Sequence, residues 1–225
     1  MSLNGKVRRH PETPVSDKHD QIAVDGKLVE PQGTIYVMMN KPRGVVTTAS
    51  DEKGRATVYD IMNIRSTNRT SQTGEPFSWL APVGRLDKAS EGLLLLTNDS
   101  EWAARIAAPE THLDKTYHVQ VGTVADERFL QSLVQGVKSN DGQVLRAKQV
   151  HRLRAGQKNC WIEIVLDEGR NRQIRRMMEA VNVEVLRLIR VAIGPLQLGD
   201  LVKGTYRALT AEEKRMLDRA MRGIA

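Results

Sequence analysis

The stretch PVGRLDKASEGLLLLTND, residues 82–99, places a charged Arg-Leu-Asp triplet just before a run of four leucines. A continuous apolar run of this length is typical of a strand that is covered on both faces. A buried strand has no structural need for a guanidinium and a carboxylate near its start. The charged pair therefore either caps a loop or serves a chemical function.

The triplet itself favours a common face for its two charges. Gly84 permits a tight turn, and alternation along the chain sends Arg85 and Asp87 to one side while Leu86 anchors the other. A carboxylate beside cations stays ionised and can act as a nucleophile or a base. A surface ion pair of little consequence has the same pattern, so both interpretations stay open.

Helices and strands alternate irregularly on both sides of this stretch. A short helix is predicted at 56–62 and a polar loop at 63–79, and a basic turn at 41–44 is predicted to lead into a second strand. Strands are predicted at 35–39, 93–96, 115–121, 160–166 and 184–193, and helices at 101–108, 125–137, from Asn171 and from Thr210. Without regular βαβ repetition, this order predicts an α+β fold with a largely antiparallel sheet.

Composition narrows the class of protein. The 225 residues are 40% hydrophobic, which is enough for a sizeable core, and no apolar run approaches the length of a membrane helix or a secretory signal. We therefore expect a cytoplasmic protein with no membrane association. One cysteine and five histidines offer no zinc-site spacing, so no metal is expected.

The charge balance points to an acidic partner. A net charge of +7 and a pI near 9.7 are compatible with binding to nucleic acid, although many basic proteins bind none. Aromatic residues make up only 4% of the chain, which argues against a platform for many stacked bases. A basic cleft suits this composition better.

The most basic segment is DEGRNRQIRRMMEAV, residues 167–181. On a helix its apolar residues share one face, while Arg172, Arg175 and Arg176 cluster on another. This is either a solvated charged face or the lining of an anion site. Like charges at these spacings repel by about 0.2–0.5 kcal/mol per pair, so an anionic partner is expected, either phosphates or a buried aspartate.

Tyr117 lies in the strand KTYHVQV, on the same face as Val119 and Val121. The simpler interpretation is a core tyrosine whose hydroxyl reaches a polar partner. The functional alternative is a ring at the wall of a cleft, on which one base stacks. His118 points the other way and is expected at the surface.

Taken together, GRLDKASEGLLLLTND, KTYHV and EGRNRQIRRM, in this order and at these intervals, closely resemble the bacterial ribosomal pseudouridine synthases that modify rRNA of either subunit at single sites. The resemblance runs from about residue 34 to the C-terminus and includes MMNKPRGVVTT and LRLIRVAIGPLQLGDLVKGTYRALTAEE. It implies the pseudouridine synthase catalytic fold, with a mixed, largely antiparallel central sheet, flanking helices and a central cleft.

The resemblance also implies an activity and a set of site residues. The family's enzymes are isomerases that need no cofactor or metal and act on a flipped-out uridine. By this resemblance Asp87 is the nucleophile, Tyr117 packs on the uracil and Arg175 pairs with Asp87. The expected RNA contacts are Arg85, which occupies the space left by the flipped nucleotide, and Lys41, Arg43, Arg170, Arg172 and Arg176.

Two domain segments are expected: a flexible N-terminal arm or linker at 1–33 and a catalytic domain at 34–225. Many family members carry a small N-terminal RNA-binding domain, which about 34 residues cannot hold, so the sequence is either a naturally short member or a truncated one. The expected partner is ribosomal RNA, with the large subunit favoured, and the chain is expected to act as a monomer.

Two rival functions remain at this point. One is a non-catalytic RNA-binding factor for ribosome assembly on the same scaffold, which the basic composition suits equally well. The other is a carboxylate-based nucleoside glycosidase, which usually needs a second acid or base and would release free uracil.

Overall fold

The computed structural model describes residues 1–10, 12–16, 19–29, 33–48, 51–63 and 80–223. The chain divides into two compact units, Met1–Thr34 and Ile35–Ala225. The polar loop expected at 63–79 lies almost wholly outside the described residues. In the described part, no helix has the length and apolar character needed to cross a membrane.

The first unit is a small antiparallel sheet of short strands in the order β2-β1-β3-β4. Its strands are β1 (Ser2–Leu3), β2 (Lys6–Val7), β3 (Ile22–Val24) and β4 (Lys27–Val29). The turn between β3 and β4 is Asp25-Gly26, with φ of 51° and 79°, which is the geometry that favours tight hairpins. Leu3 is buried within this unit.

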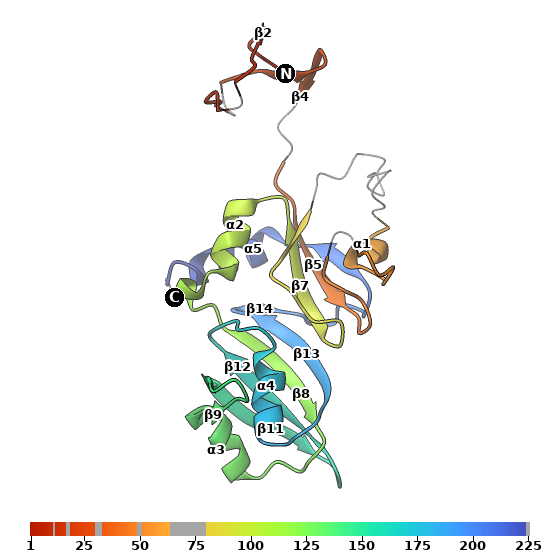
Figure 1. Ribbon diagram of the computed structural model, residues 1–225, viewed down its shortest axis with the longest axis vertical. Helices are drawn as coiled ribbons and strands as arrows, with labels where there is room; N and C mark the ends of the chain where they lie inside the picture. The colour runs from red at the N-terminus through yellow and green to blue at the C-terminus, as the bar shows by residue number, and fades with distance from the viewer. Residues whose placement is uncertain (11, 17–18, 30–32, 49–50, 64–79, 224–225) are drawn as a thin grey trace. The chain divides into compact units, whose positions relative to one another are not determined.

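The second unit is built on a nine-stranded sheet (Figure 1), with the main order β11-β12-β8-β13-β7-β5-β15. Its strands are β5 (Tyr36–Lys41), β6 (Ala81–Val83), β7 (Glu91–Thr97), β8 (Lys115–Val121), β11 (Gln149–Ala155), β12 (Cys160–Leu166), β13 (Val185–Ile193), β14 (Leu196–Gln197) and β15 (Tyr206–Ala208). Among its described pairings only β13 with β7 is parallel. The prediction of a mixed, largely antiparallel sheet is confirmed.

Helices lie against this sheet and supply its core. They are α1 (Val58–Ile61), α2 (Ser100–Ala107), the 3-10 turn η1 (Pro109–Thr111), α3 (Glu127–Gln135), α4 (Gln173–Ala180) and α5 (Ala211–Ala220). A two-stranded ribbon of β9 (Val137–Lys138) and β10 (Val144–Leu145) lies beside α3 and α4 (Figure 1). As expected, Thr210 starts the last helix with a capping box.

The four leucines of β7 show why this strand is apolar throughout. All four are fully buried, and alternation along the strand divides them between two clusters. Leu94 and Leu96 pack in the cluster that contains α1, whereas Leu93 and Leu95 pack in the cluster that contains α2 and α5. The strand is therefore covered on both faces, as its sequence predicts.

One predicted strand is absent. Residues 45–48 were expected to form a strand after the basic turn, but Val46 makes only an isolated bridge to Thr57. The segment bonds to the charged loop instead. The Thr47 hydroxyl donates to the carbonyl of Leu86 at 2.8 Å and accepts from the amide of Leu86 at 3.3 Å. This segment therefore supports the charged loop instead of extending the sheet.

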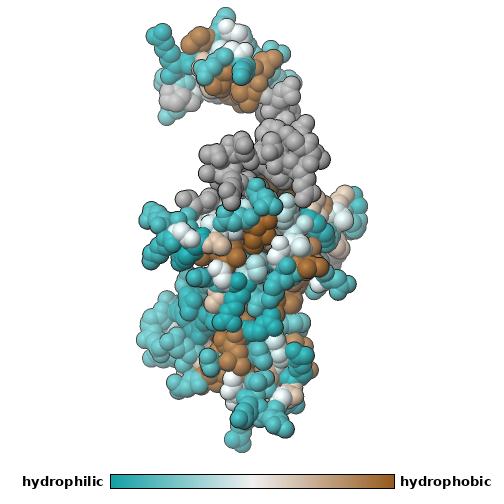
Figure 2. Space-filling view, turned by 90° about the vertical axis from the view of Figure 1, so that its right-hand side faces the viewer, coloured by the Kyte–Doolittle hydropathy of each residue, from teal (hydrophilic) through white to brown (hydrophobic). Residues whose placement is uncertain are grey.

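Most large apolar side chains of the second unit are buried. On the face seen in Figure 2, hydrophilic residues cover most of Ile35–Ala225, and hydrophobic residues form smaller patches between them. This agrees with the three buried clusters that contain most of its large apolar side chains.

Candidate active site

The charged triplet lies in the loop between β6 and β7. Gly84 adopts a φ of 71°, which favours glycine, and Leu86 is buried in the cluster beneath the loop. Arg85 is exposed and Asp87 half-buried. Leu86 is thus the anchor that the alternation predicts, and the two charges stay on the open side.

The backbone of this loop is held at every carbonyl from residue 86 to residue 90. Thr47 Oγ1 donates to the carbonyl of Leu86, and the amide of Gly44 donates to that of Lys88. Arg175 Nη2 donates to the carbonyl of Ala89 at 3.0 Å. Together with the contacts of Lys41 described next, these bonds fix the direction in which the Asp87 side chain leaves the loop.

Lys41 is a structural residue, and the expectation that it contacts RNA is wrong. Its side chain is fully buried, and Nζ donates to the carbonyls of Ser90 (2.8 Å), Pro42 (3.1 Å) and Asp87 (3.2 Å). Burial lowers the pKa of Lys41 to about 8, against the favourable effect of Asp87 and Glu91. A lysine beside a Pro-Arg-Gly turn has the local signature of a surface residue, and only the folded loop supplies its three acceptors.

Two guanidinium groups face the carboxylate of Asp87. Arg172 Nη1 lies 3.5 Å from Oδ2, and Arg175 Nε lies 4.0 Å from the same oxygen. The Asp87 side chain is 34% exposed, so the carboxylate remains accessible from the pocket although two cations face it. The arginine predicted as its partner, Arg175, is therefore close, but Arg172 is closer.

The two arginines differ in environment. Arg175 is largely buried, and burial followed by repulsion from Arg172 lowers its pKa, which Asp87 opposes. Arg172 is exposed and sits immediately before α4 with a left-handed φ of 49°. A non-glycine residue in that conformation stores strain, a feature that clusters at functional sites. The buried face of α4, which includes Ile174, Met177 and Met178, fixes the helix that carries Arg175 and begins just after Arg172.

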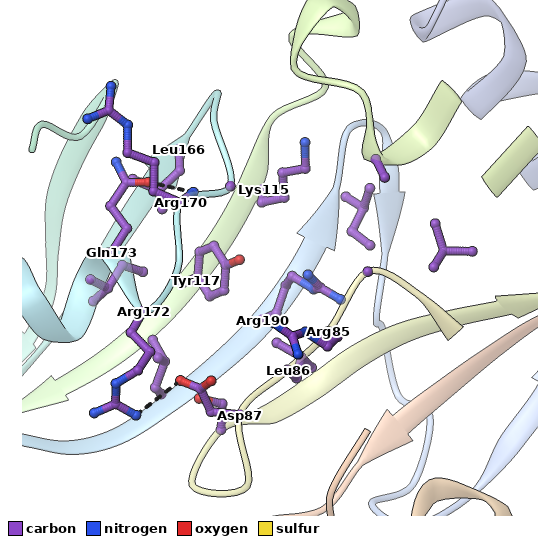
Figure 3. A pocket seen from close by; sticks show the side chains of 18 of the residues that line it. Arg85, Leu86, Asp87, Lys115, Tyr117, Leu166, Arg170, Arg172, Gln173 and Arg190 are labelled. Carbon is purple, nitrogen blue, oxygen red and sulfur yellow. Dashed lines mark hydrogen bonds and ion pairs between the residues drawn. The ribbon is translucent and has the colours of Figure 1, made fainter. Parts of the chain in front are cut away.

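Asp87 and Tyr117 line one pocket of about 190 Å³. Figure 3 shows the Tyr117 ring inside this pocket, between Asp87 and Lys115. Tyr117 is half-buried, whereas Val119 and Val121 on the same face of β8 are fully buried. Both interpretations of Tyr117 are thus partly satisfied, because the ring packs against the core on one side and faces the pocket on the other.

The remaining predicted residues are distributed around this pocket or away from it. Arg85, Arg170 and Arg172 line it, and Arg85 also borders a second, more open hollow of about 520 Å³. Arg176 does not face the pocket, because it binds Asp141 at 2.5 Å. Arg43 is exposed and donates to the carbonyl of Leu186 at 3.3 Å.

Sequence reasoning missed three residues of the site. Lys115 and Arg190 line the pocket, and Thr47 holds the loop from below. The position of Lys115, two residues before Tyr117 on one strand, was a usable signal, since residues i and i+2 share a face. Nothing local distinguishes Thr47 or Arg190.

Comparisons with known proteins agree with this geometry. A family model described as RNA pseudouridylate synthase matches residues 35–180, which include the charged loop, Tyr117 and both arginines that face Asp87. A solved structure described as a pseudouridylate synthase superposes with a TM-score of 0.67 at 27% identity, covering 96% of this chain and 87% of the other.

Curated relatives are similar over nearly the whole chain. Ribosomal large subunit pseudouridine synthase B of Bacillus subtilis is 36% identical over 219 residues, which is 96% of this chain and 84% of the relative. Ribosomal large subunit pseudouridine synthase E of Vibrio parahaemolyticus is 32% identical over 216 residues, which is 90% of this chain and 85% of the relative.

Proposed function

Because this chain belongs to the RNA pseudouridylate synthase family, we propose that it isomerises a uridine of large-subunit ribosomal RNA, with Asp87 as the catalytic carboxylate. The observation that carries the proposal is a carboxylate within 3.5–4.0 Å of two guanidinium groups at a pocket that also contains a tyrosine ring. The names of the relatives above support ribosomal RNA of the large subunit as the substrate.

The site suits a nucleotide that has left its helix. Uracil inside a duplex cannot reach Asp87, so the target must be extruded at a cost of a few kcal/mol of unstacking. Arg85, exposed between the pocket and the neighbouring hollow, is placed to fill the space that the nucleotide vacates. Tyr117 then offers a ring face to the uracil, and the filled pocket excludes water that would otherwise let the free base escape.

Asp87 breaks the bond between the base and the ribose. In one route its oxygen forms a bond to the anomeric carbon as the carbon–nitrogen bond breaks. In the other it removes the ribose 2′ proton and a glycal forms. In both routes the bonding pair leaves with uracil, which turns and forms a bond from its C5 to the anomeric carbon. In the first route this displaces the Asp87 carboxylate, and in the second C5 adds to the glycal while Asp87 returns the proton to C2′. C5 then loses its proton and N1 gains one. Either role uses Asp87 as a carboxylate, and Arg172 and Arg175 are the cations that face it.

The test is Asp87→Asn on an rRNA substrate. We expect no detectable pseudouridine from this variant, because the amide neither attacks carbon nor removes a proton. RNA affinity stays unchanged or rises slightly, since a negative charge has been removed from a groove that faces phosphates. A matched control is Asp126→Asn, which keeps a side-chain acceptor at the exposed start of α3.

Two outcomes would contradict the proposal. Normal pseudouridine formation by Asp87→Asn would remove Asp87 from the chemistry. To test which RNA is the substrate, pseudouridine is mapped in rRNA from cells that lack the protein. A missing site in the large-subunit RNA is expected, and an unchanged map would favour a protein that binds RNA without modifying it.

A further inference from the structure

Two cations inside the pocket are not explained by their contacts within the protein. Arg190 comes from β13 and Lys115 from the adjacent β8 (Figure 3). The Cα atoms of Arg190 and Tyr117 are partners across these strands, and Lys115 shares the Tyr117 face of β8. Both side chains therefore lie beside the ring on which the target base is expected to stack.

Arg190 has an unused donor. Its side chain is only 6% exposed, and Nε donates to the carbonyl of Leu93 at 2.8 Å. Nη2 is buried and, within the described part of the chain, has no hydrogen-bond partner. A buried unpaired donor costs about 1–3 kcal/mol, and more when it is charged, so this nitrogen favours an oxygen that the protein does not provide.

Lys115 lies in the same pocket without a close ion pair among the described residues. No ion pair joins it to any described carboxylate, and its neighbour Asp114 binds Lys148 at 2.8 Å instead. Burial and then repulsion from Arg190 lower the pKa of Lys115, and the negative charges of Asp114 and Asp167 oppose this shift. Asp87 is the only carboxylate among the described residues that line the pocket, against five cationic side chains, and it already faces Arg172.

We propose that Arg190 and Lys115 bind a carbonyl oxygen of the flipped-out uracil and stabilise the negative charge that the base acquires when its bond to ribose breaks. This inference rests on the proposed function. The electron pair of the broken bond stays on the base, where resonance spreads it onto the ring oxygens. Fixed donors in a site that excludes water stabilise such charge without reorganisation, and removing one donor of this kind costs about 10²–10³-fold in rate.

Burial favours a base oxygen over a phosphate. The phosphodiester groups on either side of a flipped nucleotide stay continuous with the RNA strand, so they remain near the exposed side chains. Arg170 and Arg172 are exposed and line the same pocket, which makes them the natural phosphate ligands. Arg190, with 6% of its surface exposed, is accessible to the part of the nucleotide that enters the pocket.

The experiment measures single-turnover rate and RNA affinity separately for Arg190→Met and Lys115→Met. We expect the rate at saturating RNA to fall about 10²–10³-fold for Arg190→Met, with the dissociation constant nearly unchanged. Arg154→Met is the matched control, since Arg154 is exposed on β11 and stacks on Trp161 outside the pocket. Arg190 also donates to the carbonyl of Leu93, so the thermal unfolding of each variant is measured as well. If Arg190→Met does not fold, Lys115→Met is used to test the inference.

A modified substrate separates this role from a structural one. Replacing one uracil oxygen at the target by sulfur, in 2-thiouridine or 4-thiouridine, weakens the acceptor. With one of these two substrates, the rate of the wild-type enzyme should fall relative to uridine. The rate of Arg190→Met or Lys115→Met should fall little further, because the contact to that uracil oxygen is already absent in the variant. Equal losses in wild type and variant for both substrates would overturn the inference.

Two further results would also overturn it. Weaker RNA binding with a reduced salt dependence and an unchanged saturating rate would assign the two cations to a phosphate. A wild-type rate in both variants would leave them without a role in the reaction. Neither result affects the proposed function, which is tested separately by the activity of Asp87→Asn and by the pseudouridine map of cells that lack the protein.

Discussion

Lys41 shows how a single buried charge can position a catalytic group without contacting the substrate. Its ammonium donates to three backbone carbonyls. Two of them belong to the charged loop: Asp87, which is 46 residues away along the chain, and Ser90, which is 49 residues away. Each buried carbonyl left without a donor costs about 1–3 kcal/mol. Replacing Lys41 should therefore both destabilise the protein and loosen the loop that carries Asp87.

The lowered pKa of Lys41 gives this contribution a definite pH dependence. Between its folded pKa of about 8 and the ordinary value of 10.5, the unfolded chain holds a proton on Lys41 that the folded chain does not. Raising the pH through that window therefore favours folding, by at most about 1.4 kcal/mol per pH unit. We expect the free energy of unfolding of wild type, relative to Lys41→Met, to increase from pH 7 to pH 9.5 in urea titrations.

The exposed neighbour Lys88 supplies the control for that measurement. The difference between wild type and Lys88→Met should stay constant over the same pH range. A flat difference for Lys41→Met as well would show that Lys41 remains protonated in the folded protein throughout.

Among the elements, the contact between β7 and β13 has the strictest steric requirement. The two strands run parallel and bring Gly92 against the backbone of Arg190. A Cβ built on Gly92 would lie 2.2 Å from the Arg190 carbonyl oxygen, and the residue has a φ of 103°. This one position therefore sets the separation between the strand that follows Asp87 and the strand that carries Arg190.

Gly92→Ala should be strongly destabilising for two reasons, the overlap with backbone atoms and the unfavourable φ. Because 1 kcal/mol shifts Tm by about 2–4 °C in a domain of this size, we expect a fall of more than about 5 °C or a failure to fold. Gly122→Ala is the matched control, since its Cβ would meet only ordinary contacts with Glu184. Equal Tm values for the two variants would show that β7 and β13 can separate freely.

Across the whole molecule, positive charge is used in two different ways. Some cations stabilise the fold, such as Arg176 with Asp141 and Lys41 with its carbonyls. Others, such as Arg170 and Arg172, are exposed around the pocket, where their ion pairs with Glu168 and Asp87 leave further donors for phosphates. The net charge of +7 therefore overstates the number of residues that bind RNA.

Salt dependence distinguishes these two groups. RNA affinity should fall linearly on a logarithmic scale of salt concentration, and each lost phosphate contact should reduce the slope by about 0.7–0.9. In filter-binding titrations, we expect the double variant Arg170→Gln, Arg172→Gln to reduce this slope by about twice that amount, because two phosphate contacts are lost. Arg215→Gln, on the exposed face of α5 and paired with Glu212, should keep the wild-type slope. A slope unchanged by the double variant would remove these two arginines from the RNA interface.

The sequence alone predicted the main strands and helices of the second unit and pointed to Asp87 as the central carboxylate. The leucine run predicted a strand buried on both faces, and the alternation of Tyr117, Val119 and Val121 predicted β8 and its inner face. The apolar residues of 167–181 predicted the buried face of α4. These signals are local, because side-chain periodicity and capping depend on residues within a few positions of one another.

Only the tertiary structure decided how the cations are assigned. Lys41 and Arg176 have the same local signatures as RNA-binding residues, yet closure of the sheet gives one its three carbonyls and the other Asp141. Arg190 and Lys115 enter the pocket because β8 and β13 pair side by side. The physical reason is that a cation's role depends on which acceptors lie within about 3–4 Å, and those acceptors come from segments far away in the sequence.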